Sequence, residues 1–248
     1  MVSLSAQLPA DETAVELPAG VKAVWDIGKA FRETTPTRER ICLNGLWRWQ
    51  PADPASDQVP GGRWGYIKVP GSWPGITDYM RKESQTLYPH PSWKDVKLTE
   101  VTAAWCERDF SVPSDWAGRR ISLSLDTLNS YAAVFVDGVK AGEIHFPGGD
   151  ADLTTACQPG STHRLSVLVI ALPLEGVMLS YTDSASAREI KGAVERRGLC
   201  GDVYLVSTPR GPAITEVRVE TSVRKRELTI SAALEGLESN QPYRFRAR

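Results

Sequence analysis

The chain of 248 residues carries 29 basic and 30 acidic side chains, so its formal net charge at pH 7 is −1. This balance argues against a nucleic-acid or membrane-surface partner, because both are recognised through a basic excess on the binding face. A hydrophobic fraction of 42% and a charged fraction of 24% are ordinary for a globular protein, so most of the chain is expected to fold. A chain this long can bury a large core without a metal or a disulfide.

The sequence shows no segment that predicts membrane insertion or a leader. The longest apolar run, Val167 to Leu174, is interrupted by Pro173 and is far shorter than the ~20 residues of a spanning helix. Residues 1–20 hold three acids and neither Lys nor Arg, which is unlike a secretory signal. We expect a soluble protein, either cytoplasmic or already trimmed of a signal.

Short segments of alternating apolar and polar residues, separated by 20 Gly and 17 Pro, are typical of an all-β sandwich or barrel. In chain order, a short turn around Asp26 to Arg32 is followed by expected strands at 41–49, 64–69 and 103–111. The clearest strand is 119–126, where Ile121, Leu123 and Leu125 alternate with serines, so one face is buried and the other is wet.

The next segment, 131–136, is apolar on both faces, as in a central strand that is covered on each side. It runs into Asp137-Gly138 and then 139–144, which predicts a β-hairpin, because a type I′ turn needs positive φ at both central positions. Further strands are expected at 164–172 and 202–207. Besides the turn at 26–32, the only helical candidate is Ser184 to Glu195.

Thr208 to Pro212 contains two prolines and a glycine and predicts a boundary, after which a new alternating set begins. Its apolar positions are Ile214, Val217, Val219, Leu228, Ile230, Ala232, Leu234, Tyr243, Phe245 and Ala247. Only 36 residues follow Pro212, whereas an immunoglobulin-like sandwich needs about 100. Three strands alone would leave open edges and a half-covered apolar face. We therefore expect the front part of a longer protein, either a shortened piece or a truncated gene.

Common signatures of catalysis and of metal binding are missing from the sequence. There is no H-E-x-x-H, no phosphate-binding glycine loop, no G-x-G-x-x-G and no G-x-S-x-G, and the four cysteines form no C-x-x-C pair. The three histidines have no spacing suited to a metal or a catalytic triad. We expect no cofactor and no metal.

Eight tryptophans are unusual for this length, and a tryptophan face can stack on a sugar ring while its indole N–H donates a hydrogen bond. Trp47, Trp49, Trp105 and Trp116 lie in or beside expected strands, where core packing is the simpler role. The segment 70–95 instead lacks strand alternation and carries five rings, which are Trp73, Tyr79, Tyr88, His90 and Trp93. Such a loop predicts either a ligand or partner-domain contact, or an aromatic cap on the end of the sandwich.

A family resemblance emerges from six short motifs in order. They are Leu43-Asn44-Gly45-Leu46-Trp47, Val69-Pro70-Gly71-Ser72-Trp73, the run Trp105 to Pro113 with Trp116 and Gly118, Val136-Asp137-Gly138 with Gly142, Ala151-Asp152-Leu153-Thr154, and Arg197 to Leu205. The chain from about 24 to 222 resembles the N-terminal sugar-binding-like domain of glycoside hydrolase family 2, the group of β-galactosidases, β-glucuronidases and β-mannosidases.

The resemblance implies an all-β fold in which a jelly-roll, galactose-binding-like sandwich is followed by the start of an immunoglobulin-like sandwich. The implied division is an N-terminal extension at 1–23, the jelly roll at 24–208, a linker at 209–212 and an incomplete immunoglobulin-like domain at 213–248. In the family a TIM barrel comes third.

The resemblance also implies where catalysis would occur. Family 2 enzymes are retaining glycosidases whose two glutamates lie in the barrel, the acid/base after an asparagine. Here Asn44, Asn129 and Asn240 precede Gly, Ser and Gln, so no Asn-Glu pair exists and the chain alone is expected to be non-catalytic. The acidic loop with Asp150 and Asp152, and the segment 180–197, occupy places that border the pocket in some relatives. Asp152 equally suits a turn residue that bonds its own backbone.

Three interpretations remain open, and the third of them is a degenerate fragment with no activity. The first is a non-catalytic module of a family 2-like β-glycosidase that supports, and lines in part, the active site of a barrel elsewhere. The alternative is a free-standing carbohydrate-binding module without hydrolytic activity. The expected partners are carbohydrate and the protein's own C-terminal domains, with no nucleic acid and no membrane.

Overall fold

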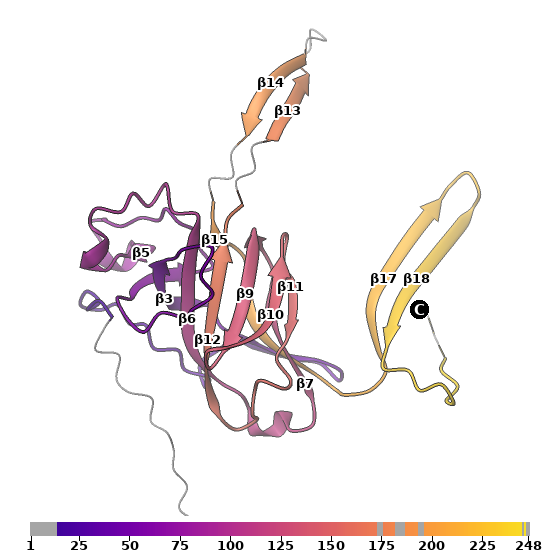
Figure 1. Ribbon diagram of the computed structural model, residues 1–248. Coiled ribbons are helices and arrows are strands. Elements are labelled where there is room, and N and C mark those ends of the chain that lie inside the picture. Colours follow the sequence, from indigo (N-terminus) through magenta and orange to yellow (C-terminus); the bar gives the residue numbers. More distant parts are fainter. Residues whose placement is uncertain (1–13, 173–175, 182–186, 193–195, 245, 247–248) are drawn as a thin grey trace, which may run out of the picture.

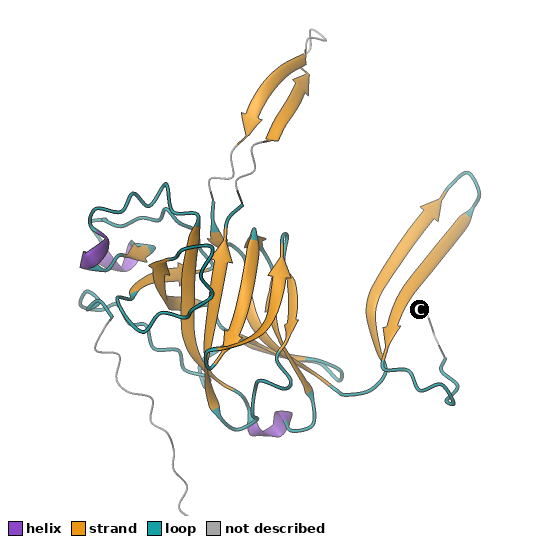
Figure 2. Cartoon of the chain, in the orientation of Figure 1, coloured by secondary structure: helices purple, strands orange, loops and turns teal. Residues whose placement is uncertain are grey.

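The computed structural model describes residues 14–172, 176–181, 187–192, 196–244 and 246 (Figure 1). Within these residues the regular structure is strand, apart from three short 3₁₀ turns at Lys82–Ser84, Pro91–Trp93 and Ser114–Trp116 (Figure 2). No helix in this part of the chain is long and apolar enough to cross a membrane.

Two antiparallel sheets form a sandwich. The larger has seven strands in the order β10-β9-β12-β6-β3-β4-β5, and the smaller has five in the order β1-β2-β16-β7-β11. The seven are β10 (Val139–His145), β9 (Tyr131–Val136), β12 (Thr162–Ile170), β6 (Ala103–Ser111), β3 (Gly45–Pro51), β4 (Gly65–Val69) and β5 (Leu87–Tyr88). The five are β1 (Arg32–Thr34), β2 (Glu39–Cys42), β16 (Val203–Thr208), β7 (Arg120–Leu125) and β11 (Gly149–Asp152).

Three further pairs are separate from these sheets. They are β8 (Leu128–Asn129) with β15 (Gly198–Leu199), β13 (Gly176–Tyr181) with β14 (Ala187–Gly192), and β17 (Ala213–Ser222) with β18 (Glu227–Glu235).

The core lies between the two sheets because strands of both present an apolar row inward. On β7 of the smaller sheet, Ile121, Leu123 and Leu125 are at most 2% exposed, while the serines between them are half-buried. Val134 on β9 and Val167 on β12, from the larger sheet, join them in one cluster. The predicted alternation and the all-β sandwich are thus confirmed.

The larger sheet is covered on its outer face as well, which explains the strand that is apolar on both sides. Trp105 and Phe135 lie on this outer face with ring centroids 5.2 Å apart, and Trp64 and Leu168 complete the cluster. Ala14 of the N-terminal segment packs against it. The prediction that 131–136 is a central, doubly covered strand is therefore confirmed.

Next to this cluster the outer face is ionic. The register of three neighbouring strands sets Glu107 between Arg48 and Ser166. Arg48 Nε lies 2.9 Å from Glu107 Oε1, and Ser166 donates to Oε2 of the same carboxylate at 2.8 Å. Asp109 joins Arg48 and Arg164 at 3.1 and 3.0 Å. Burial raises the pKa of Glu107, and the nearby Arg48 opposes that rise. These charged side chains therefore have a structural role in the larger sheet.

The predicted hairpin is confirmed, since Asp137 and Gly138 have φ of 50° and 82° between β9 and β10. The expected strand at 41–49 is split in two, because Leu43 and Asn44 leave the sheet and the Asn44 amide donates to Asp202 at 2.8 Å. The helical candidate at 184–195 is wrong where it can be compared, since 187–192 form β14. Its remaining residues, 184–186 and 193–195, lie outside the described part of the chain.

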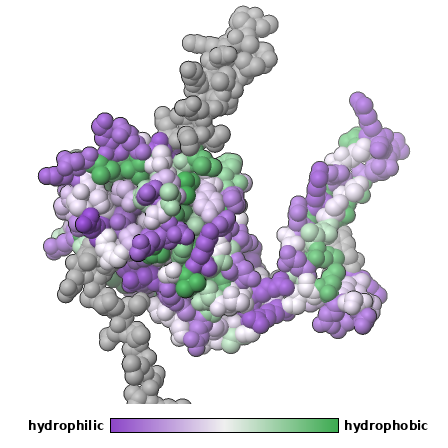
Figure 3. All heavy atoms as spheres, viewed as in Figure 1, coloured by the Kyte–Doolittle hydropathy of each residue, from purple (hydrophilic) through white to green (hydrophobic). Residues whose placement is uncertain are grey.

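The chain beyond β16 forms the hairpin β17–β18, whose apolar positions share one face. The register pairs Ile214 with Leu234 and Val219 with Ile230, and a bulge between Ile214 and Glu216 keeps them in phase. Ile214, Val217, Val219, Leu228 and Leu234 are between 43% and 62% exposed. Figure 3 shows hydrophobic surface gathered on one side of this hairpin. The third expected strand is absent at Tyr243 and Arg244, which are described, while 245 and 247 lie outside the described residues.

Candidate functional site

The aromatic segment 70–95 covers the β5 end of the larger sheet. Backbone contact is close, since a Cβ at Gly65 on β4 would lie 2.3 Å from the carbonyl oxygen of Tyr88. Only glycine lets the segment approach the strand in this way. The 3₁₀ turn at Pro91–Trp93 begins at His90, whose side chain accepts a hydrogen bond from the Ser92 backbone N–H.

Trp73, the first of the five predicted rings, is fully buried. Its indole N–H donates to the Val101 carbonyl at 2.9 Å, and its ring lies 5.8 Å from that of Trp49. No face of Trp73 is open to a ligand in this conformation, so it fixes the segment to the core. This matches the aromatic-cap interpretation at this position.

The other rings differ in exposure. Tyr88 is 5% exposed and donates its hydroxyl hydrogen to the Lys82 carbonyl, whereas Tyr79 is 50% exposed. Trp93 is half-buried, with its ring edge-on to Trp49 at 5.5 Å, and His90 stands 5.9 Å from Trp93. Tyr79, His90 and Trp93 are therefore the rings that solvent, and so a ligand, can reach.

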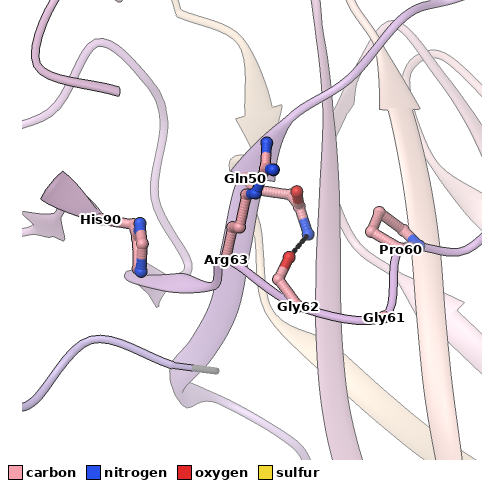
Figure 4. Close-up of a pocket in the computed structure, with 6 residues that line it drawn as sticks. All are labelled: Gln50, Pro60, Gly61, Gly62, Arg63 and His90. Carbon is pink, nitrogen blue, oxygen red and sulfur yellow. Dashed lines mark hydrogen bonds between the residues drawn. The ribbon is translucent and has the colours of Figure 1, made fainter. Parts of the chain in front are cut away.

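A pocket of about 660 Å³ opens beside His90. Gln50, Pro60, Gly61, Gly62, Arg63 and His90 line it. Figure 4 shows His90 on one side and Pro60 on the other, with Arg63 and Gln50 between them. The pocket is shallow and broadly open to solvent.

The pocket carries one cationic side chain, Arg63, among its lining residues. The Gln50 amide donates to the Gly62 carbonyl at 3.1 Å, which ties the loop 60–63 to β3. Arg63 is exposed and forms no hydrogen bond or ion pair with the residues that the structure describes. No Asp or Glu lines the pocket. Sequence reasoning missed Gln50 and Arg63. The adjacent Pro60-Gly61-Gly62 turn was the one signal that could have pointed to them.

The two predicted acids lie at the opposite edge of the sandwich. Asp150 and Asp152 are on β11, the edge strand of the smaller sheet that contacts β10, whereas the aromatic segment borders β5 at the other end of the larger sheet (Figure 1). Both are exposed, and Asp152 accepts a hydrogen bond from the Thr154 backbone N–H at 2.8 Å, the turn role that the sequence also allowed. The structure does not bring the rings and the acids together.

A second cavity of about 500 Å³ lies between the N-terminal segment and the ionic outer face, where Trp25, Arg48 and Glu107 are among its lining residues. Of its charged lining residues, Arg48 is paired with Glu107 and Asp109, as described above.

Among the described residues, no group of three His, Cys, Asp or Glu side chains is placed to hold a metal. The four cysteines are free thiols. Burial raises the pKa of Cys106, and it raises that of Cys157 to about 12, which keeps both protonated and unreactive at neutral pH.

Four of the six motifs that carry the family resemblance contact one another. The Asn44 side-chain carbonyl accepts from the Val203 backbone N–H at 3.0 Å. Trp73 pairs with Arg197 as an isolated bridge, and Arg197 donates to the Val101 carbonyl at 2.9 Å. Arg108, which is 5% exposed, donates to the carbonyls of Leu43, Asn44 and Leu46. Burial lowers the pKa of Arg108 to about 10. These motifs are structural in this chain.

Comparison with solved structures places the fold. The β-glucuronidase from Ruminococcus gnavus in complex with D-glucuronic acid matches with a TM-score of 0.58 and 15% identity, over 84% of this chain and 36% of that one. The β-D-glucuronidase from Dictyoglomus thermophilum matches with a TM-score of 0.54 and 17% identity, over 83% and 34%. The fold is that of the N-terminal part of bacterial β-glucuronidases.

Comparison with curated protein sequences also finds β-glucuronidases. The chain is 30% identical to the β-glucuronidase of Felis catus over 238 residues, 82% of this chain and 34% of that protein. It is 27% identical to that of Rattus norvegicus over 169 residues, 62% of this chain and 24% of that protein. No family model matches. The chain is thus a partial homologue of β-glucuronidases, which are glycoside hydrolase family 2 enzymes, and it spans between a quarter and a third of these relatives' length.

Proposed function

We propose that this chain is the non-catalytic N-terminal part of a family 2-type β-glycosidase that acts on β-D-glucuronides. The observation that carries the proposal is a match along 82% of the chain to a β-glucuronidase of which it covers only 34%. The sandwich fold supports it, as does the lack of any Asn-Glu pair such as the family uses for its acid/base.

In this proposal residues 24–208 are a jelly-roll, galactose-binding-like domain, 1–23 an extension, 209–212 a linker, and 213–248 the first strands of an immunoglobulin-like domain. Two observations support the division. The strand β16 ends at Thr208 and β17 begins at Ala213. The hairpin β17–β18 carries an uncovered apolar face, as expected of strands whose facing sheet is contributed by later residues.

The aromatic segment is the part that would contact carbohydrate or a neighbouring domain. Tyr79, His90 and Trp93 are the accessible rings, whereas Trp73 and Tyr88 are buried and donate hydrogen bonds to backbone carbonyls. Asp150 and Asp152 would form a separate contact at the β11 edge, where their exposed carboxylates can accept hydrogen bonds from sugar hydroxyls.

The direct test is hydrolysis of 4-methylumbelliferyl β-D-glucuronide by the purified 248-residue chain. The proposal predicts no turnover above the rate in buffer, because the two carboxyl groups of a retaining site are supplied by another domain. Turnover that survives repeated purification and follows the chain through gel filtration would overturn it.

The alternative is a free-standing carbohydrate-binding module. The pocket beside the aromatic segment favours it, since such a site can act without a barrel. The two candidates differ in what the coding sequence holds past Arg248. The first requires further immunoglobulin-like strands and then a barrel of about 250 residues, and the second requires neither.

A further inference from the structure

The pocket bounded by residues 60–63 and His90 has a composition suited to an anionic sugar. We propose that it binds a sugar acid, a pyranose ring that carries a carboxylate, with Arg63 and His90 as the groups that hold the carboxylate. The inference rests on the carbohydrate-related function proposed above, and it adds the charge of the ligand and the residues that recognise it.

Arg63 is the first ground for this inference. The other arginines of this region are engaged: Arg48 with Glu107 and Asp109, and Arg108 with three backbone carbonyls. Arg63 has no such partner among the described residues, and no acid lines its pocket. A guanidinium presents two parallel N–H groups, which match the two oxygens of a carboxylate better than they match a hydroxyl.

The backbone at Arg63 is held in an unfavourable conformation that aims this side chain. Its φ of 65° is in the left-handed region, which is unfavourable for a residue with a Cβ. Both neighbours are fixed: Gly62 by the Gln50 amide, and Trp64 by its burial and by the Val15 N–H that its carbonyl accepts at 2.8 Å. Strain of this kind at a pocket is a sign of a positioned functional group.

His90 supplies a second donor from the facing side. Its Nδ1 accepts the Ser92 N–H at 3.2 Å, so the neutral ring carries its hydrogen on Nε2. The ring is held in place by the 3₁₀ turn that it begins and by Trp93, whose ring centroid is 5.9 Å away. Two donors from separate segments, one of them charged, therefore border a pocket with room for a monosaccharide.

The test is a titration of the ¹⁵N-labelled 248-residue chain, followed by amide shifts, with three probes: sodium D-glucuronate, D-glucose and sodium acetate. Glucuronate has both the ring and the carboxylate, glucose has the ring alone, and acetate the carboxylate alone. We expect glucuronate to bind about tenfold more tightly than either of the others, with shifts at residues 60–63 and 88–93.

The decisive variant is Arg63→Gly, because glycine adopts φ of 65° without strain and so removes the guanidinium without harming the fold. Glucuronate affinity is expected to fall about tenfold in this variant, to the level of glucose. Arg63→Lys, which keeps the charge and loses the paired donors, should give an intermediate value. The exposed Arg224 in the turn of the β17–β18 hairpin provides the matched control, and Arg224→Gln should bind as the unaltered chain does.

Each other outcome overturns the inference in a distinguishable way. Equal binding of glucuronate and glucose, or full binding by Arg63→Gly, leaves a carbohydrate site without carboxylate recognition. Equal binding of glucuronate and acetate shows an anion site that does not read the sugar ring. No binding of any probe removes the site altogether, while the accessory role, which is tested by the sequence past Arg248, is unaffected.

Discussion

Replacing Trp73 with alanine separates a structural role for the aromatic segment from a ligand role. The side chain is fully buried against Trp49, and truncation of such a residue costs about 3–5 kcal/mol, because the cavity cannot close completely. The lost indole hydrogen bond adds little, since the Val101 carbonyl keeps its bond from Arg197 at 2.9 Å. We therefore expect the free energy of unfolding to fall by about 4 kcal/mol, a large part of the ~5–15 kcal/mol of a typical domain.

The measurement is urea unfolding followed by far-UV circular dichroism, which does not depend on the tryptophan removed. Trp73→Phe should recover roughly half of the loss, because it refills most of the cavity. Tyr79→Ala, at a ring that is 50% exposed in the same segment, should change stability by less than about 0.5 kcal/mol. A loss below about 1 kcal/mol for Trp73→Ala, together with abolished sugar binding, would refute the argument, because the ring would then face a ligand and not the core.

Three further experiments, two with variants and one with the unaltered chain, test other parts of the structure. Arg108→Lys should lower the free energy of unfolding by about 2–4 kcal/mol in the same assay, because an ammonium cannot replace two guanidinium nitrogens that donate to three carbonyls. An unchanged free energy of unfolding would contradict the packing described. Cys106 and Cys157, whose pKa values are raised by burial, should resist Ellman's reagent at pH 8 until urea is added, and rapid labelling of all four thiols in the native chain would count against that burial. Val219→Lys changes an exposed apolar residue on β17. It should reduce the binding of a hydrophobic dye, and also self-association in analytical ultracentrifugation, without altering the unfolding of the sandwich. A matching loss of sandwich stability would show that this face is covered.

The strands were predictable where burial imposes a period of two. The row Ile121, Leu123 and Leu125, and the turn at Asp137-Gly138, carry their structure in local sequence. The sequence predicts an acidic loop where the structure has β11, because Ala151 is the one buried residue of this strand. Its conformation is decided by pairing with β7. The strand β14 was read as helical, because pairing with β13, and not local pattern, decides its conformation.

The sequence predicts the candidate site as a segment, and the exposure of its individual rings lies beyond the sequence. Five rings between residues 70 and 95 pointed to the segment, but composition cannot tell a ring that faces the core, such as Trp73, from one that faces solvent, such as Tyr79. A role for Arg63 could not be predicted from the sequence, because it depends on the positive φ of this residue and on the absence of acids from the pocket that it shares with His90.

The coding sequence beyond Arg248 tests the central claim most directly. The account predicts further alternating strands that complete a sandwich over the apolar face of β17 and β18, and then a barrel of about 250 residues with two glutamates, one of them after an asparagine. A stop codon directly after Arg248 in the intact gene, or a continuation with no barrel, would contradict it and favour the free-standing binding module.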